Sequence, residues 1–230
     1  MTQASGNLQG RASVLAELLQ ERYSCRGYRP DAVPRATIDA ILQLAQRTAS
    51  WCNSQSWQVW VASAAATDRL REALVPYARA HQPGPDLEWP AYEGVYLQRR
   101  RECGLQLYGA TGVARGDAEA ADRQRMENFR FFGAPHVAIV TSDATLGVYG
   151  AIDCGAYVSN FMLAARAHGV AAIAQAALAS FPDFWRAQLG FSAQRRVVCG
   201  IAFGFEDPAH PANSFRTRRA PVADAAQWVE

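Results

Sequence analysis

Apolar residues recur at helical spacing in several separate segments of the chain. In the first of these, Val14, Leu15, Leu18 and Leu19 share one face of a helix that Ser13 can cap. The same spacing predicts further helices, separated by glycines, prolines and polar residues. The expected helices run over 13–22, over 34–48, from 67 to a bend or stop near 76, and over 119–131, 147–168 and 182–189.

Strand patterns alternate with these helical patterns. Residues 57–61 alternate and are rich in β-formers, 136–141 form a continuous apolar run typical of a buried strand, and 196–204 form the strongest strand pattern. Residues 170–177 are small and apolar and lead into the last predicted helix. Because strands interleave with helices and no internal repeat occurs, we expect a single α+β or mixed α/β domain over residues 1–230.

The predicted helix at 147–168 differs from the others because it is apolar nearly all round. The only side chains in it that carry a charge near neutral pH, or gain one on mild acidification, are Asp153, Arg166 and His168. A helix of this kind is expected to be buried on every face, and in a chain of this size a subunit interface is one good way to bury it.

Residues 81–130 have a different character, polar and studded with aromatic side chains. We interpret them as a partly helical excursion over the core, and such insertions often cover a site. Three consecutive arginines, Arg99, Arg100 and Arg101, lie in its middle. For at least two of them, a solvated helix face is the simpler interpretation.

Composition limits the classes of partner. The 230 residues are 50% hydrophobic and carry a formal net charge of +2, which favours a protein with a real core and gives no global reason to expect a nucleic-acid partner. The charge-free stretch 154–165 is too short to span a bilayer. Residues 1–10 contain no apolar run typical of a signal peptide. We therefore expect a soluble, cytoplasmic protein with no membrane partner.

The first polar motif is Arg22-Tyr23-Ser24-Cys25-Arg26. In an extended backbone, alternate side chains point the same way, so Arg22, Ser24 and Arg26 would converge. Two guanidinium groups and a hydroxyl are the donors that a phosphate monoester needs. A solvated edge is the alternative interpretation.

The second polar motif is the stretch 49–57, Ala-Ser-Trp-Cys-Asn-Ser-Gln-Ser-Trp, between a predicted helix and a predicted strand. It carries hydroxyls, carboxamides and two tryptophans where a plain surface turn would carry Gly, Pro and Asp, and loops at such junctions often carry function. Cys52 has no electropositive neighbour close in sequence, which favours a packed thiol over a nucleophile.

The sequence contains few other motifs that indicate catalysis or ligand binding. It contains no glycine-rich phosphate loop and no His-x-x-x-His or His-Glu pair for a catalytic metal. The five cysteines are widely spread without a Cys-x-x-Cys pair, so a structural zinc site is not expected either. An enzyme that lacks acid-base and nucleophilic groups often lets a cofactor carry the chemistry.

The two motifs resemble blocks of the FMN-dependent nitroreductase family. Residues 22–26 resemble its Arg-x-Ser-x-Arg/Lys opening, and residues 49–57 resemble its Ala-Pro-Ser-x-x-Asn-x-Gln-Pro-Trp loop. Further blocks with counterparts are Phe132 to Pro135, Asp153 to Gly155, Gly200 to Gly204 and Asn213 to Pro221, so the resemblance covers about residues 13–221. It implies an α+β fold in which a mixed central sheet is wrapped by helices, and an intertwined homodimer with an FMN in each interface groove.

The resemblance also implies roles for particular residues. The FMN phosphate is expected at Arg22, Ser24, Arg26, Arg216 and Arg219, and Tyr23 is expected among the cofactor-binding residues. The loop is expected to place Ser50, Trp51, Asn53 and Gln55 beside the ring or the ribityl chain, with part of the set coming from the partner subunit. A backbone N–H near flavin N5 is expected from Gln175 or Ala176. The family often has Glu-Gly there, and it has Pro at the position of Ser56.

The implied activity is reduction of a nitroaromatic compound, with NAD(P)H as reductant and ping-pong kinetics, to the hydroxylamine. Tyr92, Tyr96 and Tyr108 of the excursion are expected to shape the acceptor pocket, with Trp51 stacking on the substrate; for each tyrosine, ordinary packing is the alternative. An arginine of 99–101 is available for a substrate carboxylate. The competing hypotheses are another reductase of this architecture, acting on quinones or enones or using oxygen, and a non-catalytic FMN-binding sensor.

Overall fold

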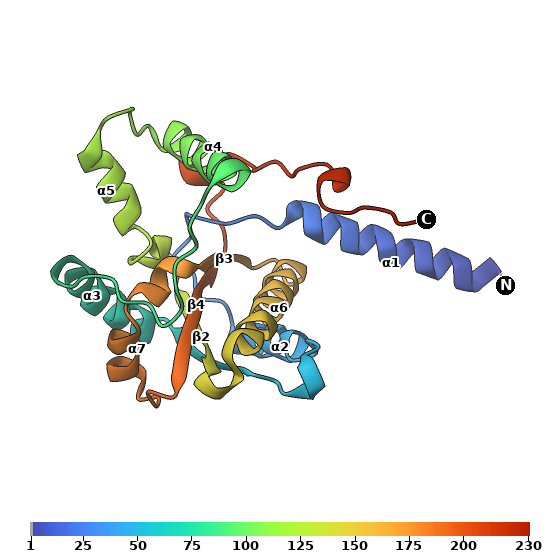
Figure 1. The fold of residues 1–230 in the computed structure, drawn as a ribbon, viewed down its shortest axis with the longest axis horizontal. Coiled ribbons are helices and arrows are strands. Elements are labelled where there is room, and N and C mark those ends of the chain that lie inside the picture. Colours follow the sequence, from blue (N-terminus) through green and yellow to red (C-terminus); the bar gives the residue numbers. More distant parts are fainter. Residues whose placement is uncertain (1) are drawn as a thin grey trace.

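The structure, a computed structural model, describes the backbone of residues 2–230 and the side chains of residues 8–230. It consists of helices around a central sheet (Figure 1). The helices are α1 (Thr2–Glu21), α2 (Arg35–Ala45), α3 (Ala65–Ala80), α4 (Gly94–Thr111), α5 (Ala118–Met126), α6 (Gly147–Ala167) and α7 (Pro182–Leu189). The strands are β1 (Trp57–Ser63), β2 (His136–Asp143), β3 (Ala171–Gln175) and β4 (Arg195–Gly204).

The four strands form one sheet in the order β1-β2-β4-β3, and each neighbouring pair is antiparallel. Among the described residues, the predicted mixed character comes only from an isolated parallel bridge between Ser24 and Ala172 at the edge strand β3. The sequence pattern did not predict β3 as a strand. Its residues are mostly alanine, which has a weak preference for strands, so pairing with β4 decides its conformation.

Both faces of the sheet are covered by helices, as Figure 1 shows. Val137 and Ile139 of β2 pack on the side of α3 and α7, whereas Ala138 and Val140 pack on the side of α2 and α6. Alternate side chains of a strand point to opposite faces, so a strand in the middle of such a sandwich is apolar throughout. This arrangement explains the continuous apolar run that predicted β2.

Several helix bounds differ from the expected ones for identifiable reasons. Helix α1 begins at Thr2 rather than at residue 13, because its first turns carry no apolar stripe for a pattern to detect. Helix α3 continues past Pro76 to Ala80, so of the bend or stop expected near residue 76 the stop is wrong; burial of Leu70 and Leu74 against the core outweighs the preference of proline for helix ends. The helix expected over 119–131 ends at Met126.

Helix α6 has the expected length but not the expected burial. Tyr157 and Phe161 lie in the core, yet Val148, Tyr149 and Ile152 are 67%, 53% and 58% exposed. The expectation that every face is buried is therefore wrong for the chain by itself. One apolar face of α6 is open.

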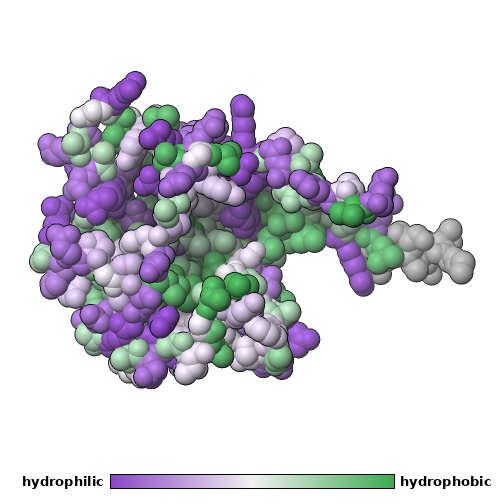
Figure 2. All heavy atoms as spheres, viewed as in Figure 1, coloured by the Kyte–Doolittle hydropathy of each residue, from purple (hydrophilic) through white to green (hydrophobic). Residues whose placement is uncertain are grey.

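Helix α1 projects from the body, and the C-terminal segment runs out beside it (Figure 1). Its apolar side chains Val14, Leu15 and Leu19 are exposed, as is Trp228 near the C-terminus. Figure 2 shows apolar surface in the recess between α1 and the body. No helix in the described part of the chain is long and apolar enough to cross a membrane.

Candidate functional site

The predicted phosphate-binding residues come together around a cavity of about 330 Å³. We call Arg22, Ser24, Arg26, Arg216 and Arg219 the arginine cradle, because all five line this cavity. Tyr23 lines it too. The first three lie just after α1, and the last two lie in the C-terminal tail, about 190 residues away in sequence. The fold therefore unites the two basic segments.

Asn213 joins the two halves of the cradle. This side chain is buried; its Oδ1 accepts from the backbone N–H of Arg26 at 2.8 Å, and its Nδ2 donates to the carbonyls of Gly27 and Asp207 at 2.9 Å each. A buried carboxamide with its donors and acceptor satisfied holds both segments in one geometry. The sequence offered Asn213 only as the first residue of the C-terminal block, with no role.

The cradle gathers positive charge without a matching carboxylate. Burial, and then the neighbouring Arg219, lower the pKa of Arg22, and burial lowers the pKa of Arg26. Among the described residues, no carboxylate lies within 4 Å of the guanidinium groups of Arg22, Arg26, Arg216 or Arg219. A bound anion would relieve the repulsion that this arrangement creates.

Arg216 is fixed by an aromatic ring. Its guanidinium carbon lies 3.5 Å from the ring centroid of Tyr23, and its Nη1 donates to the carbonyl of Asn213 at 2.7 Å. The Tyr23 hydroxyl in turn donates to Glu206 at 3.0 Å, and burial raises the pKa of Tyr23. Tyr23 thus supports the cradle through its ring face, a contact typical of arginine and aromatic residues.

The edge strand β3 leads from the cradle to the residues expected near flavin N5. Ser24 bridges to Ala172, and the chain then extends to Ala176, about 13 Å farther at about 3.3 Å per residue. Ala174 and Ala176 are exposed along this edge. Ala176 is the first residue of a short 3-10 helix (Ala176–Ser180), where an amide N–H has no acceptor within the helix. An outside acceptor can therefore bind it.

Gln175 turns its side chain away from this edge. It is 2% exposed, and its Nε2 donates to the carbonyl and the Oδ1 of Asn128 at 3.0 and 3.3 Å. Its Oε1 is buried without a partner within the described residues. Only the backbone of Gln175 is therefore available to a ligand at the edge of β3.

The loop at 49–57 is held against α6 by Asp153. The Asp153 carboxylate accepts from the backbone N–H of Trp51 at 3.3 Å and from the hydroxyl of Ser54 at 3.2 Å. The hydroxyl of Ser56, at the position where the resembling family has proline, donates to the carbonyl of Gly150 at 3.0 Å. Sequence analysis gave Asp153 no role; its signal was a single carboxylate in an otherwise apolar helix.

The loop at 49–57 has an unusual backbone conformation, and the side chains at its tip are exposed. Cys52, Asn53 and Gln55 all have positive φ, which costs free energy in residues with a Cβ and is common at functional sites. The hydroxyl of Ser50 accepts from the backbone N–H of Gln55 at 2.9 Å and so stabilises this shape. Trp51 is 59% exposed, and Asn53 and Gln55 are exposed as well.

The loop and the cradle lie apart within the chain. Helix α6 carries Asp153, which holds the loop, and Arg166, which pairs with Glu21 at 2.8 Å just before the cradle. The two residues of α6 are separated by about 20 Å at about 1.5 Å per residue. The structure therefore brings the predicted phosphate residues together, but it does not bring the loop to them in the same chain.

The excursion borders the cradle through α4. A cavity of about 750 Å³ lies between α4 and the C-terminal tail, and it shares Cys103, Thr217 and Arg219 with the cradle cavity. Tyr92, just before α4, and Tyr96, in the first turn of α4, are exposed, whereas Tyr108 is half-buried. The excursion is thus placed to cover a ligand in the cradle.

Asp86 anchors the start of the excursion to the core, a role that sequence analysis missed. It accepts from Arg186 Nη2 at 2.8 and 2.7 Å and from the backbone N–H of Val197 at 2.8 Å. Among the described residues, no cluster of three or more His, Cys, Asp or Glu side chains is placed to hold a metal ion.

The sequence model of the Nitroreductase family matches residues 19–205. Nitroreductase NfnB of Mycolicibacterium smegmatis is 36% identical over 219 residues, which cover 94% of this chain and 93% of that protein. A 4-nitrobenzoate reductase of Nocardioides sp. (strain LMS-CY) is 34% identical over 215 residues, covering 89% and 85%.

Among solved structures, the fold is similar to that of the FMN-dependent nitroreductase NfnB from Mycobacterium smegmatis in complex with NADPH. The TM-score is 0.91 at 36% identity, and the match covers 95% of this chain and 99% of that one. The FMN and NADPH-dependent NfnB from Sphigopyxis sp. strain HMH matches with a TM-score of 0.89 at 27% identity, over 94% and 98%.

Proposed function

The chain belongs to the nitroreductase family, and from that premise we propose that it is an FMN-dependent enzyme that uses NAD(P)H to reduce nitroaromatic compounds. The relatives described above include nitroreductases and a 4-nitrobenzoate reductase, and the solved neighbours are FMN-dependent. Reduction in two-electron steps to the hydroxylamine, with ping-pong kinetics, is the reaction we expect.

The arginine cradle is the observation that carries this proposal. Its guanidinium groups lack carboxylate partners among the described residues, and they line a cavity of about 330 Å³, which has room for a phosphate group. Charge-assisted hydrogen bonds from Arg22, Ser24 and Arg26 would hold the FMN phosphate, joined by Arg216 and Arg219. The edge of β3 then gives the length of extended chain along which the rest of FMN would lie, up to the amide of Ala176.

FMN, when bound, supplies the ring that takes a hydride from NAD(P)H and passes electrons to the acceptor. The residues of this chain have the remaining tasks of binding and orientation. The amide of Ala176 would donate to flavin N5, and the tether from Gln175 to Asn128 fixes the backbone that presents this amide. Tyr92, Tyr96 and Tyr108 would limit the space open to a flat acceptor, and Trp51 would stack on it.

A homodimer would bring the loop of one chain to the cradle of another. The open apolar face of α6, with Val148 and Ile152, and the projecting helix α1, with Leu15 and Leu19, offer a surface that a second copy would cover. The distance of about 20 Å along α6 between Asp153 and the cradle side supports a site built from two chains. A cytoplasmic location agrees with the use of NAD(P)H.

Two measurements on the purified protein test the function. Flavin released by heat should be FMN by mass, and NADPH oxidation should depend on an added nitroarene such as 4-nitrobenzoate. A colourless protein that does not bind added FMN would contradict the cofactor. Turnover with quinones but not with nitroarenes would assign the chain to a different reductase of this fold, and flavin that NADPH never reduces would indicate a binding protein.

Co-expression of two defective chains tests whether the loop of one subunit and the cradle of the other form one site. One carries Arg219→Gln in the cradle, and the other carries Asn53→Ala in the loop. If each site combines one chain's loop with the other chain's cradle, a mixed dimer contains one intact site and is more active than either parent. Activity that stays at the average of the parents would place both halves of the site in one chain.

A further inference from the structure

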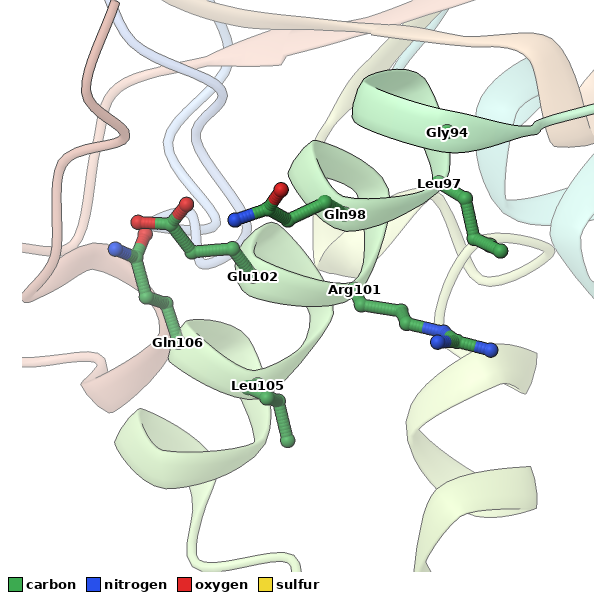
Figure 3. A pocket seen from close by; sticks show the side chains of 7 residues that line it. All are labelled: Gly94, Leu97, Gln98, Arg101, Glu102, Leu105 and Gln106. Carbon is green, nitrogen blue, oxygen red and sulfur yellow. The ribbon is translucent and has the colours of Figure 1, made fainter.

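Helix α4 presents only one side to the proposed site. Figure 3 shows Arg101 pointing away from the residues that border the cavity next to the cradle, which are Gln98, Glu102 and Gln106. The two arginines before it have other contacts: Arg99 approaches Asp224 at 3.9 Å, and the guanidinium carbon of Arg100 lies 5.4 Å from the ring centroid of Tyr92. The excursion contacts residues of the proposed FMN site again at its far end, in the turn that follows α5.

This turn has a rare backbone conformation. Three successive residues have positive φ: Phe131 at 57°, Phe132 at 52° and Gly133 at 78°. In residues with a bulky side chain, this conformation costs free energy and persists only where the surroundings fix it. Burial fixes it here, since Phe131 is fully buried and Phe132 is 6% exposed. We call residues 128–133 the left-handed turn.

Arg71 of α3 holds the left-handed turn in place. Its Nε donates to the carbonyl of Arg130 at 2.9 Å, and its Nη2 donates to the carbonyl of Ala134 at 2.6 Å. The same guanidinium pairs with Asp68, and its carbon lies 5.7 Å from the ring centroid of Phe131. Hydrogen bonds from a charged donor are among the stronger ones in proteins. The turn is therefore fixed to the core and can serve as a rigid support.

The first residue of the left-handed turn holds the ring end of the proposed FMN site. The carbonyl of Asn128 accepts from Nε2 of Gln175 at 3.0 Å and from the N–H of Phe131 at 3.2 Å, and the Oδ1 of Asn128 accepts from the same Nε2 at 3.3 Å. A carbonyl can only accept, so Nε2 rather than Oε1 of Gln175 has to face it. Gln175 directly precedes Ala176, whose amide is the proposed donor to flavin N5.

The buried glutamine has a cost that an apolar side chain would avoid. Gln175 is 2% exposed, and its Oε1 has no partner among the described residues. A buried acceptor without a partner is unfavourable, whereas methionine has a similar size and no such group. What glutamine provides and methionine cannot is the pair of hydrogen bonds from Nε2 to Asn128.

The other end of the left-handed turn supports the arginine cradle. The guanidinium carbon of Arg26 lies 5.9 Å from the ring centroid of Phe132. The face of an aromatic ring attracts a cation and so favours one position of the guanidinium group. One short turn thus contacts a residue proposed for the FMN phosphate and the residue next to the proposed N5 donor.

We propose that the left-handed turn positions both ends of the FMN site. Asn128 is a positioning residue for the amide of Ala176, through Gln175, and Phe132 is a positioning residue for the guanidinium of Arg26. Each acts through a residue proposed to contact FMN, and neither has to contact FMN itself. This inference rests on the proposed function and adds to it the element that fixes the phosphate end and the N5 end relative to each other.

Gln175→Met and Asn128→Ala test the ring end. Gln175→Met removes both hydrogen bonds to Asn128, and Asn128→Ala removes the one to Oδ1. On anaerobic mixing of the FMN-loaded protein with saturating NADPH, flavin reduction should be about 3- to 10-fold slower in Gln175→Met and less affected in Asn128→Ala, because a hydrogen bond that orients the N5 donor is lost. The double variant should be no slower than Gln175→Met, since both substitutions break the same tether.

Sulfite binding gives a second readout at the ring end that does not depend on NADPH. Sulfite adds to N5 of an oxidised flavin and bleaches it, so its Kd reports on the surroundings of N5. That Kd should rise in Gln175→Met by about the factor that slows flavin reduction, while the Kd for FMN should change less than about twofold. Asn128 is half-buried, so Asn128→Ala still decides the question if Gln175→Met does not fold.

Phe132→Leu tests the phosphate end. It keeps an apolar side chain in the core but removes the ring face beside Arg26. The Kd of the apoprotein for FMN should rise about 3- to 10-fold, whereas the Kd for riboflavin, which has no phosphate, and the rate of flavin reduction should change less than about twofold.

Phe129→Leu is the matched control for both ends. Phe129 belongs to the same turn and is 4% exposed, but its ring packs on that of Phe181, with the centroids 5.5 Å apart. It loosens the core beside the turn without touching Gln175 or Arg26. The rate of flavin reduction and the ratio of the FMN and riboflavin Kd values should therefore stay within about twofold of the wild type.

Several results would overturn the inference while leaving nitroarene reduction intact. These are a wild-type rate of flavin reduction in both Gln175→Met and Asn128→Ala, a double variant in which the two losses multiply, equal weakening of FMN and riboflavin binding in Phe132→Leu, and losses of the same size in Phe129→Leu. A wild-type protein that does not bind FMN, or whose bound flavin NADPH does not reduce, would instead refute the proposed function itself.

Discussion

Replacing Arg219 by Gln should separate FMN binding from folding. Arg219 lines the arginine cradle, and with burial it lowers the pKa of Arg22. Its own side-chain hydrogen bonds are local and exposed, from Nη1 to the hydroxyl of Thr217 at 3.0 Å and to the carbonyl of Arg218 at 3.1 Å. The substitution therefore removes a cation from the cradle without opening the core.

The expected magnitudes follow from these contacts. A hydrogen bond between a charged donor and a phosphate contributes about 1.5–3 kcal/mol, so loss of the Arg219 donor should raise the Kd for FMN about 10- to 150-fold. The free energy of unfolding of the apoprotein should change by no more than about 0.5 kcal/mol, as is usual when an exposed side chain is replaced. Removing the charge of Arg219 also relieves its repulsion with Arg22, which stabilises the folded apoprotein.

Titration of the apoprotein with FMN and with riboflavin is the assay. Riboflavin has no phosphate, so Arg219→Gln should weaken FMN binding and leave riboflavin binding nearly unchanged. Arg218→Gln is the control, because Arg218 carries the same charge but does not line the cradle cavity. Equal losses for FMN and riboflavin, or equal losses in the two variants, would refute the assignment of the cradle to the phosphate.

Three further substitutions test other parts of the structure. Asp86→Ala should lower the free energy of unfolding by about 2–4 kcal/mol in urea, because Arg186 and the N–H of Val197 lose a largely buried acceptor; an unchanged urea midpoint would contradict the anchor. Gln175→Glu should lower the midpoint potential of bound FMN by roughly 40 mV in a redox titration, because its carboxylate, although turned away from the edge of β3 toward Asn128, would add negative charge behind the backbone that faces the reduced ring; no lowering would sink this prediction. Burial lowers the pKa of His136, so the folded chain binds fewer protons than the unfolded chain below about pH 6.5, and stability falls as the solution is acidified. His136→Gln should therefore flatten the fall of Tm between about pH 7 and 5, and an unaltered slope would contradict this.

Local signals were sufficient for much of the fold. Pro182 at the first position and Gly190 just after the end predicted α7 with its observed bounds, and Gly190 has the left-handed conformation that ends a helix. The bounds of α6 agree to within a residue. Strand β3 had no such signal, because alanine favours helices and only pairing with β4 makes this segment a strand.

The sequence predicted the part of the site that lies within one short segment. It did not predict the contacts between segments that are far apart in the chain. The spacing of Arg22, Ser24 and Arg26 predicted convergence, and the structure places them around one cavity. The buried roles of Asn213 and Asp86 depend on contacts between segments more than 100 residues apart, which no local pattern records. Similarly, nothing in the run of three arginines distinguished one from another before their partners were known.

The most direct test of the central claim is an anaerobic stopped-flow measurement on the FMN-loaded protein. NADPH alone should bleach the flavin absorbance within seconds, and subsequent mixing with 4-nitrobenzoate should restore it at a rate that depends on nitroarene concentration. Flavin that remains oxidised in the presence of NADPH, or reduced flavin that 4-nitrobenzoate does not reoxidise, would contradict the assignment of this chain as a nitroarene reductase.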